Sequence, residues 1–230
     1  MKKTVLNFLL IAGVAAGSIS CKNDKQNQVK ANEAQEAEVI SPEAMTFEID
    51  TAASVIQWRG TKPTGEHLGT IDIQNGQIKA TANELVGGRV VINMNSITVT
   101  DEGMDEKGKR NLENHLKGTV EGKETDFFNV NKYPEAFFEI TGMSEQEGKR
   151  MLEGNLTIKD ESKHIMFPVT TTIGKEELTL KSETFSIDRT DWGINYRSNS
   201  VFPDLGDKFI SDNMELTIEV KAKRTELTEL

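Results

Sequence analysis

Three histidines, His67, His115 and His164, are the side chains in this sequence best suited to metal or acid–base chemistry. No two of them have the short spacing of a zinc site, and the single cysteine, Cys21, lies near the N-terminus. The sequence also lacks the serine-elbow, phosphate-loop and dinucleotide-binding motifs of common enzymes. We therefore predict no metal, no cofactor and no catalytic residue; a metal bound by scattered residues is the alternative.

His67 differs from the other two histidines because it shares a strand face with Ile71 and Ile73. It is either a polar group at the mouth of a cavity or a strand-end histidine bonded to a backbone carbonyl, and the second interpretation is favoured. His115 and His164 are expected to be surface or packing residues.

Arg189 shares the face of an extended chain with apolar residues in "FSIDRTDWGI". A buried guanidinium must be paired, because an isolated buried charge is very costly. Asp191 or Asp188 would make a structural clasp at the end of a barrel, which is the favoured interpretation. The alternative partner is the anionic headgroup of a ligand. Trp192 would then cap the barrel or stack on the guanidinium.

The elements that position these side chains alternate with period two from Thr46 onward, which predicts about eight strands, each apolar on one face. Asn75-Gly76 predicts a tight hairpin. Residues 103–118 predict a helix, with Leu112 and Leu116 four residues apart and a C-cap at its last glycine. Strands with one buried face form antiparallel sheets. The fold class is therefore all-β, an antiparallel barrel or sandwich with one α-helix.

Several residues on the inward faces of these strands are small. They are Gly69, Ala80, Ala82, Gly88 and Gly154. An eight-stranded barrel is just wide enough to hold one small ligand, so these positions favour an apolar cavity. The alternative is that the large residues Trp58, Phe167 and Phe185 fill the space.

The N-terminus is typical of a bacterial export signal, with Lys2 and Lys3 before a short apolar run. "GSISC" resembles a lipobox with cleavage before Cys21, although Ser18 stands where such motifs usually carry Leu. An ordinary signal peptide is the alternative. We predict a signal peptide over 1–20, a lipidated cysteine and flexible tether over 21–45, a barrel domain over 46–224 and a tail over 225–230.

The chain is acidic, with 37 Asp and Glu against 27 Lys and Arg and a net charge of −10. An acidic surface repels phosphate backbones, so nucleic acid is excluded as a partner.

Several ordered blocks resemble the YceI-like family. They are "IQWRGTKPTGEHLGTIDIQNGQI", "INMNSI", "NHLKG", "DFFNVNKYPEAFFEITG", "GNLTIKDESKHIMFPV", "FSIDRTDWGINY" and "ISDNMELTIEVKA". The resemblance implies a lipocalin-like exported β-barrel that holds a polyisoprenoid or another long-chain lipid, and no enzymatic activity. One departure is the polar stretch "TVEGKET", which is expected to lengthen the loop after the helix and change access to one barrel end.

The resulting hypothesis is an exported barrel that binds or carries an isoprenoid or fatty-acyl lipid. It would lie in the periplasm or cell envelope, anchored to a membrane at Cys21. The polar end of the ligand, or a barrel-end clasp, is assigned to His67, Arg189, Asp191 and Trp192. The lipid tail is expected along Trp58, Ile71, Val90, Ile92, Phe138, Leu156, Phe167, Val169, Phe185, Ile187 and Leu216. An envelope stress or structural protein with a packed barrel, and an enzyme acting on a lipid-like substrate, are the alternatives.

Overall fold

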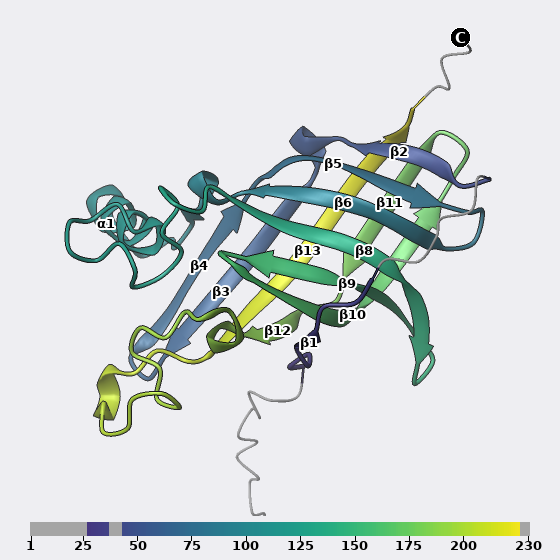
Figure 1. Ribbon diagram of the computed structural model, residues 1–230. Helices are drawn as coiled ribbons and strands as arrows, with labels where there is room; N and C mark the ends of the chain where they lie inside the picture. The colour runs from purple at the N-terminus through teal and green to yellow at the C-terminus, as the bar shows by residue number, and fades with distance from the viewer. Residues whose placement is uncertain (1–26, 37–42, 226–230) are drawn as a thin grey trace, which may run out of the picture.

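The computed structural model describes residues 27–36 and 43–225. These residues form an antiparallel β-barrel with one α-helix at one end (Figure 1). In chain order the elements are β1 (Asn32–Glu33), β2 (Met45–Ile49), β3 (Val55–Lys62), β4 (Gly65–Ile71), β5 (Ile73–Ala80), β6 (Leu85–Asn93), β7 (Thr98–Val99), α1 (Glu106–Lys117), β8 (Glu135–Gln146), β9 (Lys149–Ile158), β10 (Glu161–Ile173), β11 (Glu177–Ser182), β12 (Phe185–Asp188) and β13 (Asn213–Arg224).

Eight strands close the barrel in the order β2, β5, β6, β8, β9, β10, β11 and β13. The ring closes because β13 pairs with β11 along one edge and with β2 along the other. Every pairing between named strands is antiparallel, as expected for strands with one buried face. The predicted all-β barrel of about eight strands with one α-helix is therefore confirmed.

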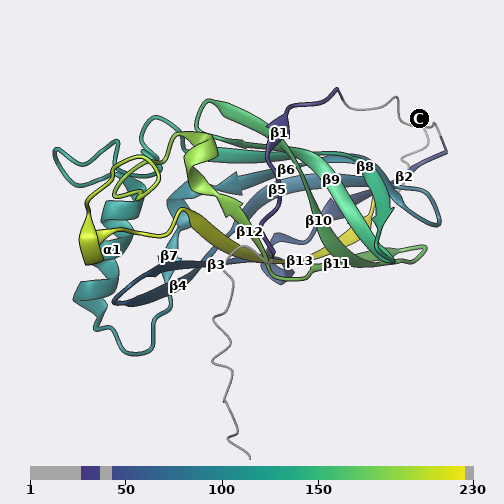
Figure 2. The same cartoon turned by 90° about the horizontal axis from the view of Figure 1, so that it is seen from below.

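β13 extends past the closed ring, and there its neighbours change. Residues 214–219 pair with β3, and residues 213–216 pair with β12 on the opposite edge. β3 continues the sheet to β4 and β7. At this end of the molecule the β3–β4 hairpin, α1 and the loop 193–212 lie together, as both views show (Figures 1 and 2).

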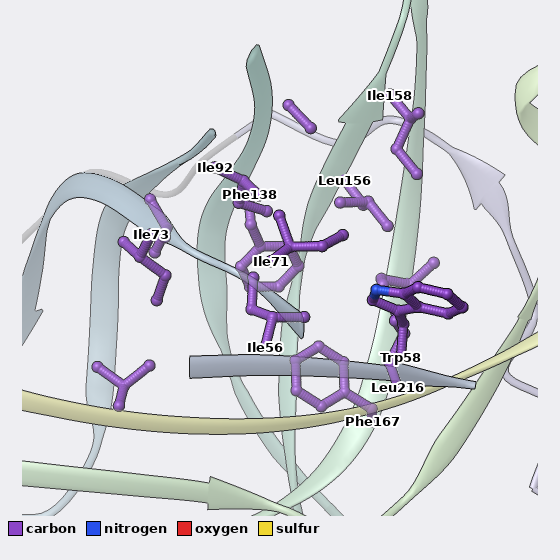
Figure 3. Close-up of a cluster of buried hydrophobic side chains, with 14 of the residues drawn as sticks. Ile56, Trp58, Ile71, Ile73, Ile92, Phe138, Leu156, Ile158, Phe167 and Leu216 are labelled. Carbon is purple, nitrogen blue, oxygen red and sulfur yellow. The ribbon is translucent and has the colours of Figure 1, made fainter. Parts of the chain in front are cut away.

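The interior holds the apolar face of each strand. Ile71, Phe138, Leu156 and Leu216 gather there from four different strands (Figure 3). The alternation seen in the sequence places these residues inward, and all of them are buried. One continuous apolar core therefore lines the inside of the barrel.

The space beside two of the small inward residues is occupied by aromatic rings. A Cβ atom at Gly69 would collide with the indole of Trp58, and one at Gly154 would collide with the ring of Phe138. The prediction that large residues fill such gaps is correct at these positions, and Trp58 is one of the residues it named. Space for a ligand must therefore lie elsewhere.

The predicted hairpin at Asn75-Gly76 is wrong, because both residues lie inside β5 and pair with β6. β4 and β5 are separated at Asp72 and do not pair with each other; the tight turn follows β5, where the Thr81 amide donates to the carbonyl of Glu84 at 2.9 Å. Gly76 serves a close backbone approach: an added Cβ would lie 2.8 Å from the carbonyl oxygen of Arg89.

The predicted helix is confirmed as α1, with its ends as the sequence indicates. The Asp105 carboxylate accepts a hydrogen bond from the Gly108 amide at 2.7 Å, which caps the N-terminus. Gly118 is in the left-handed conformation, and its amide donates to carbonyls of the last turn. Leu112 and Leu116 are half-buried against the core.

Part of the segment expected to be a tether is docked on the barrel. β1 pairs with β10, and the Val29 amide donates to the carbonyl of Ser186 in β12 at 2.8 Å. The Asn155 side chain exchanges two hydrogen bonds with the backbone of Gln35, at 2.7 and 3.0 Å. Residues 27–36 therefore bridge β12 and β10. The predicted signal peptide and Cys21 lie outside the described residues.

Candidate functional site

A cavity of about 610 Å³ lies at the barrel end where α1, the β3–β4 hairpin and the loop 193–212 meet. Its volume is in the range of small-molecule sites. Trp58, Gly60 and Lys62 of β3 line it, because alternate residues of a strand share a face. The loop 118–134 after α1 contributes Lys123 and Phe127, among others. This loop contains the polar stretch "TVEGKET", so the prediction that the stretch affects one barrel end is consistent with the structure.

The deep side of the cavity is apolar. It is lined by Trp58, Ile71, Ile97, Leu112, Leu116, Phe127, Phe128 and Ile194. Beyond it lies a second void of about 70 Å³, whose lining residues are all apolar. Ile71, Phe128 and Met214 border both spaces, so these three side chains separate the cavity from the void.

All the residues predicted to line a lipid tail are buried in the barrel core. Trp58 borders the larger cavity and Ile71 borders both spaces, whereas Val90 and Val169 border neither. The others line the inner void: Ile92, Phe138, Leu156, Phe167, Phe185, Ile187 and Leu216. The predicted set therefore surrounds the small void more than the large cavity.

Arg189 is buried, and its guanidinium is held by backbone carbonyls. Nη1 donates to the carbonyl of Ile194 at 2.6 Å, Nε to Ser211 at 3.0 Å and Nη2 to Ile210 at 3.0 Å. Nη2 also lies 3.4 Å from the Asp212 carboxylate. Burial lowers the pKa of Arg189, and the negative charges of Asp212 and, to a smaller extent, Asp188 oppose this shift. The guanidinium stays charged.

Asp191 and Asp188 are not the clasp partners that the sequence suggested. Asp191 is exposed. The pKa of its carboxyl is raised, mainly by partial desolvation and also by the nearby charge of Asp188. A carboxylate paired with a guanidinium would show the opposite shift. Asp188 instead accepts hydrogen bonds from the amide and hydroxyl of Thr190. The clasp exists, but its acid is Asp212.

Trp192 is buried, and its indole Nε1 donates to the carbonyl of Leu156 at 3.0 Å. Among the described residues, no cation–π contact joins it to Arg189. It therefore fixes the turn after β12 to β9, which is closer to the predicted capping role than to stacking.

His67 and His115 both border the cavity, and each has a carboxylate partner. His67 Nδ1 lies 2.7 Å from Asp101, and His115 Nε2 lies 2.7 Å from Asp126. His67 is thus bonded to a side chain and not to the backbone carbonyl that the sequence suggested. His115 also packs edge-on against Phe127 and Tyr196.

His164 lies on the outside of β10, opposite β1, with almost no exposed surface. Its Nε2 lies 3.4 Å from the Thr141 hydroxyl and 3.7 Å from Glu153. It is a packing residue, as expected, and residues 27–36 cover this part of the wall.

Several residues that line the cavity were missed by the sequence reasoning. Lys123, Tyr196, Arg197 and Lys208 belong to loops without alternation, so no periodic signal marks them. Leu112 and Leu116 carried a helical signal, which identified the helix but not the cavity that it borders.

Residues 27–36 and 43–225 contain no group of three His, Cys, Asp or Glu placed to hold a metal ion. Within the same residues, no helix has the length and apolar character needed to cross a membrane.

The fold is similar to those of several solved structures. BcnA of Burkholderia cenocepacia has a TM-score of 0.57 at 20% identity, covering 76% of this chain and 99% of that one. A polyisoprenoid binding domain from Saccharophagus degradans, implicated in plant cell wall breakdown, has a TM-score of 0.52 at 13% identity, covering 79% and 99%. No curated protein matches the chain. At these identities the similarity shows a shared fold.

The sequence itself carries a family match over the barrel. Residues 47–222 match the model of the YceI-like domain; this is most of the chain and runs from β2 to near the end of β13. The chain therefore belongs to the YceI-like family.

Proposed function

We propose that this protein binds a long-chain amphiphile of isoprenoid or fatty-acyl type, with the tail on the apolar floor of the cavity. The observation that carries the proposal is the 610 Å³ cavity with an apolar void behind it. The name of the Saccharophagus degradans neighbour supports the class of ligand. The loops at the cavity mouth would then meet the polar end of the ligand.

The burial of a tail supplies much of the free energy that useful affinity needs. Removing about 300 Å² of apolar surface from water is worth roughly 7 kcal/mol. A micromolar complex needs about 8 kcal/mol, before ordering costs that the ligand's polar end must help offset.

Binding is favoured over catalysis by the family match and by the name of the polyisoprenoid-binding neighbour. His67, His115 and Arg189 each hold a structural partner at the cavity wall. Each histidine keeps a second ring nitrogen, the site that a general acid or base would use, so the experiment must also detect turnover. A reaction product in place of an intact lipid in the experiment below would favour the enzyme alternative.

The experiment is solvent extraction of the full-length protein purified from its native host, followed by mass spectrometry. A cavity-filling variant makes it specific. Gly60 borders the cavity and has no atom within 4 Å of an added Cβ, so Gly60→Phe would place a ring in the cavity. Gly142 is equally open but borders neither space, so Gly142→Phe is the matched control.

The expected result is one long-chain lipid per chain in the wild type and in Gly142→Phe, and little or none in Gly60→Phe. A wild-type protein without lipid, which also binds no added long-chain lipid, would support the packed structural barrel. Equal lipid in both variants would place the ligand elsewhere.

We also propose export to the periplasm or cell envelope with an anchor at Cys21. The support is the N-terminal sequence pattern alone, since these residues lie outside the described structure. After growth with a labelled fatty acid, denaturation and solvent extraction to remove bound lipid, the wild type should keep covalent label and Cys21→Ala should have none. Label in both variants would argue against this anchor.

A further inference from the structure

The rim of the cavity has the opposite charge to the chain as a whole. The chain has an excess of acids and a net charge of −10. Among the described residues that line the cavity, Lys62, Lys123, Arg197 and Lys208 are exposed cations, and Asp207 is the sole acid. The four cations come from three separate segments: the end of β3, the loop after α1 and the loop 193–212.

These four cations are not neutralised by neighbouring acids. Within residues 27–36 and 43–225, none of them forms an ion pair. Arg197 lies 5.3 Å over the ring of Tyr196, which orients its guanidinium. Asp101 and Asp126 lie near the cavity but already bond His67 and His115.

The rim and the floor together complement the two parts of an acidic amphiphile, an anionic headgroup and an apolar tail. A positive rim around a low-dielectric hollow concentrates its field at the opening. Lysine and arginine donate charge-assisted hydrogen bonds to carboxylate or phosphate oxygens. Apolar side chains adjoin these cations: Phe127 packs against Tyr196, over which Arg197 lies, and Trp58 shares a face of β3 with Lys62.

We propose that Lys62, Lys123, Arg197 and Lys208 form a subsite for the anionic headgroup, carboxylate or phosphate, of the bound amphiphile. The proposal rests on the proposed function and specifies its ligand class. It places the headgroup at the exposed rim and not at Arg189, whose guanidinium already donates hydrogen bonds to backbone carbonyls. The tail then points inward toward Phe128.

The test compares ligands that differ only in the headgroup. Full-length protein is titrated with palmitate and with hexadecanol, and with farnesyl phosphate and farnesol. The rim variant carries Lys62→Gln, Lys123→Gln, Arg197→Gln and Lys208→Gln. The control variant carries the same charge change at lysines that border neither space and form no ion pair: Lys79→Gln, Lys159→Gln, Lys175→Gln and Lys221→Gln.

The expected result is that the wild type and the control bind each anion more tightly than its alcohol. The rim variant should lose about tenfold in affinity for the anions and little for the alcohols, and added salt should reduce the anion preference. Thermal unfolding checks that both variants fold; the rim side chains are exposed, so folding should be unaffected.

Each other outcome has a distinct meaning. Equal binding of acid and alcohol by the wild type would overturn the headgroup subsite and leave lipid binding intact. Equal losses in the rim and control variants would overturn it as well. Binding of neither ligand would overturn the proposed function. Inorganic phosphate that competes as well as farnesyl phosphate would identify a free-anion site and overturn the lipid headgroup.

Discussion

The Arg189 guanidinium donates a 2.6 Å hydrogen bond to the carbonyl of Ile194, five residues further along the chain. Its other donors reach the carbonyls of Ser211 and Ile210, so one side chain joins both ends of the loop 193–212 to β12. This loop forms one wall of the cavity. The buried charge is therefore structural and acts on the site through the loop.

Removing the guanidinium should destabilise the fold strongly. Arg189→Met leaves several carbonyls and Asp212 without their donor, and we expect a loss of about 3 kcal/mol in the free energy of unfolding by denaturant titration. Arg59→Met is the control, because Arg59 forms half-exposed ion pairs with Glu66 and Glu215. Its loss should be about 1 kcal/mol or less. Similar losses for both variants would argue against the clasp.

The glycines opposite aromatic rings should not tolerate even one methyl group. Gly154→Ala would place a Cβ against the carbonyl of Glu139 and the ring of Phe138, and we expect a cost of about 1–3 kcal/mol. Gly60→Ala, where the added Cβ meets no atom within 4 Å, should change stability little. Thermal unfolding of the two variants decides the matter; equal stabilities would contradict the close packing.

Phe128 separates the cavity from the inner void, so its removal should lengthen the binding site. Phe128→Ala should shift the preferred ligand to longer chains, measured by competition among fatty acids of increasing length. It should also cost about 3–5 kcal/mol of stability. Phe47→Ala removes a buried ring that borders neither space and is the control. A shift in preference with both variants, or with neither, would contradict the separating role.

Asn155 should determine how firmly residues 27–36 are held. Asn155→Ala removes the two hydrogen bonds to Gln35 and should lower the local opening free energy by about 1–2 kcal/mol. Hydrogen exchange should accelerate at the amides of Gln35 and Val29 and stay unchanged in the barrel core. Asn131→Ala, at an exposed asparagine, is the control. Unchanged exchange in Asn155→Ala would show that other contacts hold the segment.

The barrel could be predicted because alternation is a local signal that burial enforces. Phe185, Ile187, Leu156 and Leu216 were placed inward by period two alone, and all are buried. Asn75-Gly76 misled the prediction because a glycine serves a turn and a close strand approach equally well. Sequence order cannot distinguish these uses.

The cavity could be predicted much less well, since its walls are loops. Lys123, Arg197 and Lys208 meet at the rim only because α1 and the loop 193–212 fold over the same barrel end. The partners of Arg189 were also hidden, because most of them lie more than twenty residues away, at Ile210, Ser211 and Asp212. Sequence proximity suggested Asp191 as the acid that pairs with Arg189, whereas the fold brings Asp212 to it.

The docking of residues 27–36 changes the mechanics of any attachment at Cys21. The first described contact of this segment with the barrel is at Asn27, whose carbonyl accepts a hydrogen bond from the amide of Ser186. Ser186 lies three residues before Arg189. Asn27 follows Cys21 by six residues, a reach of about 20 Å at full extension. A membrane-bound cysteine would therefore keep the barrel within a short distance of the bilayer. Tension applied at Cys21 would act first on the hydrogen bonds that join residues 27–29 to β12 and β1 to β10, before it reached β2.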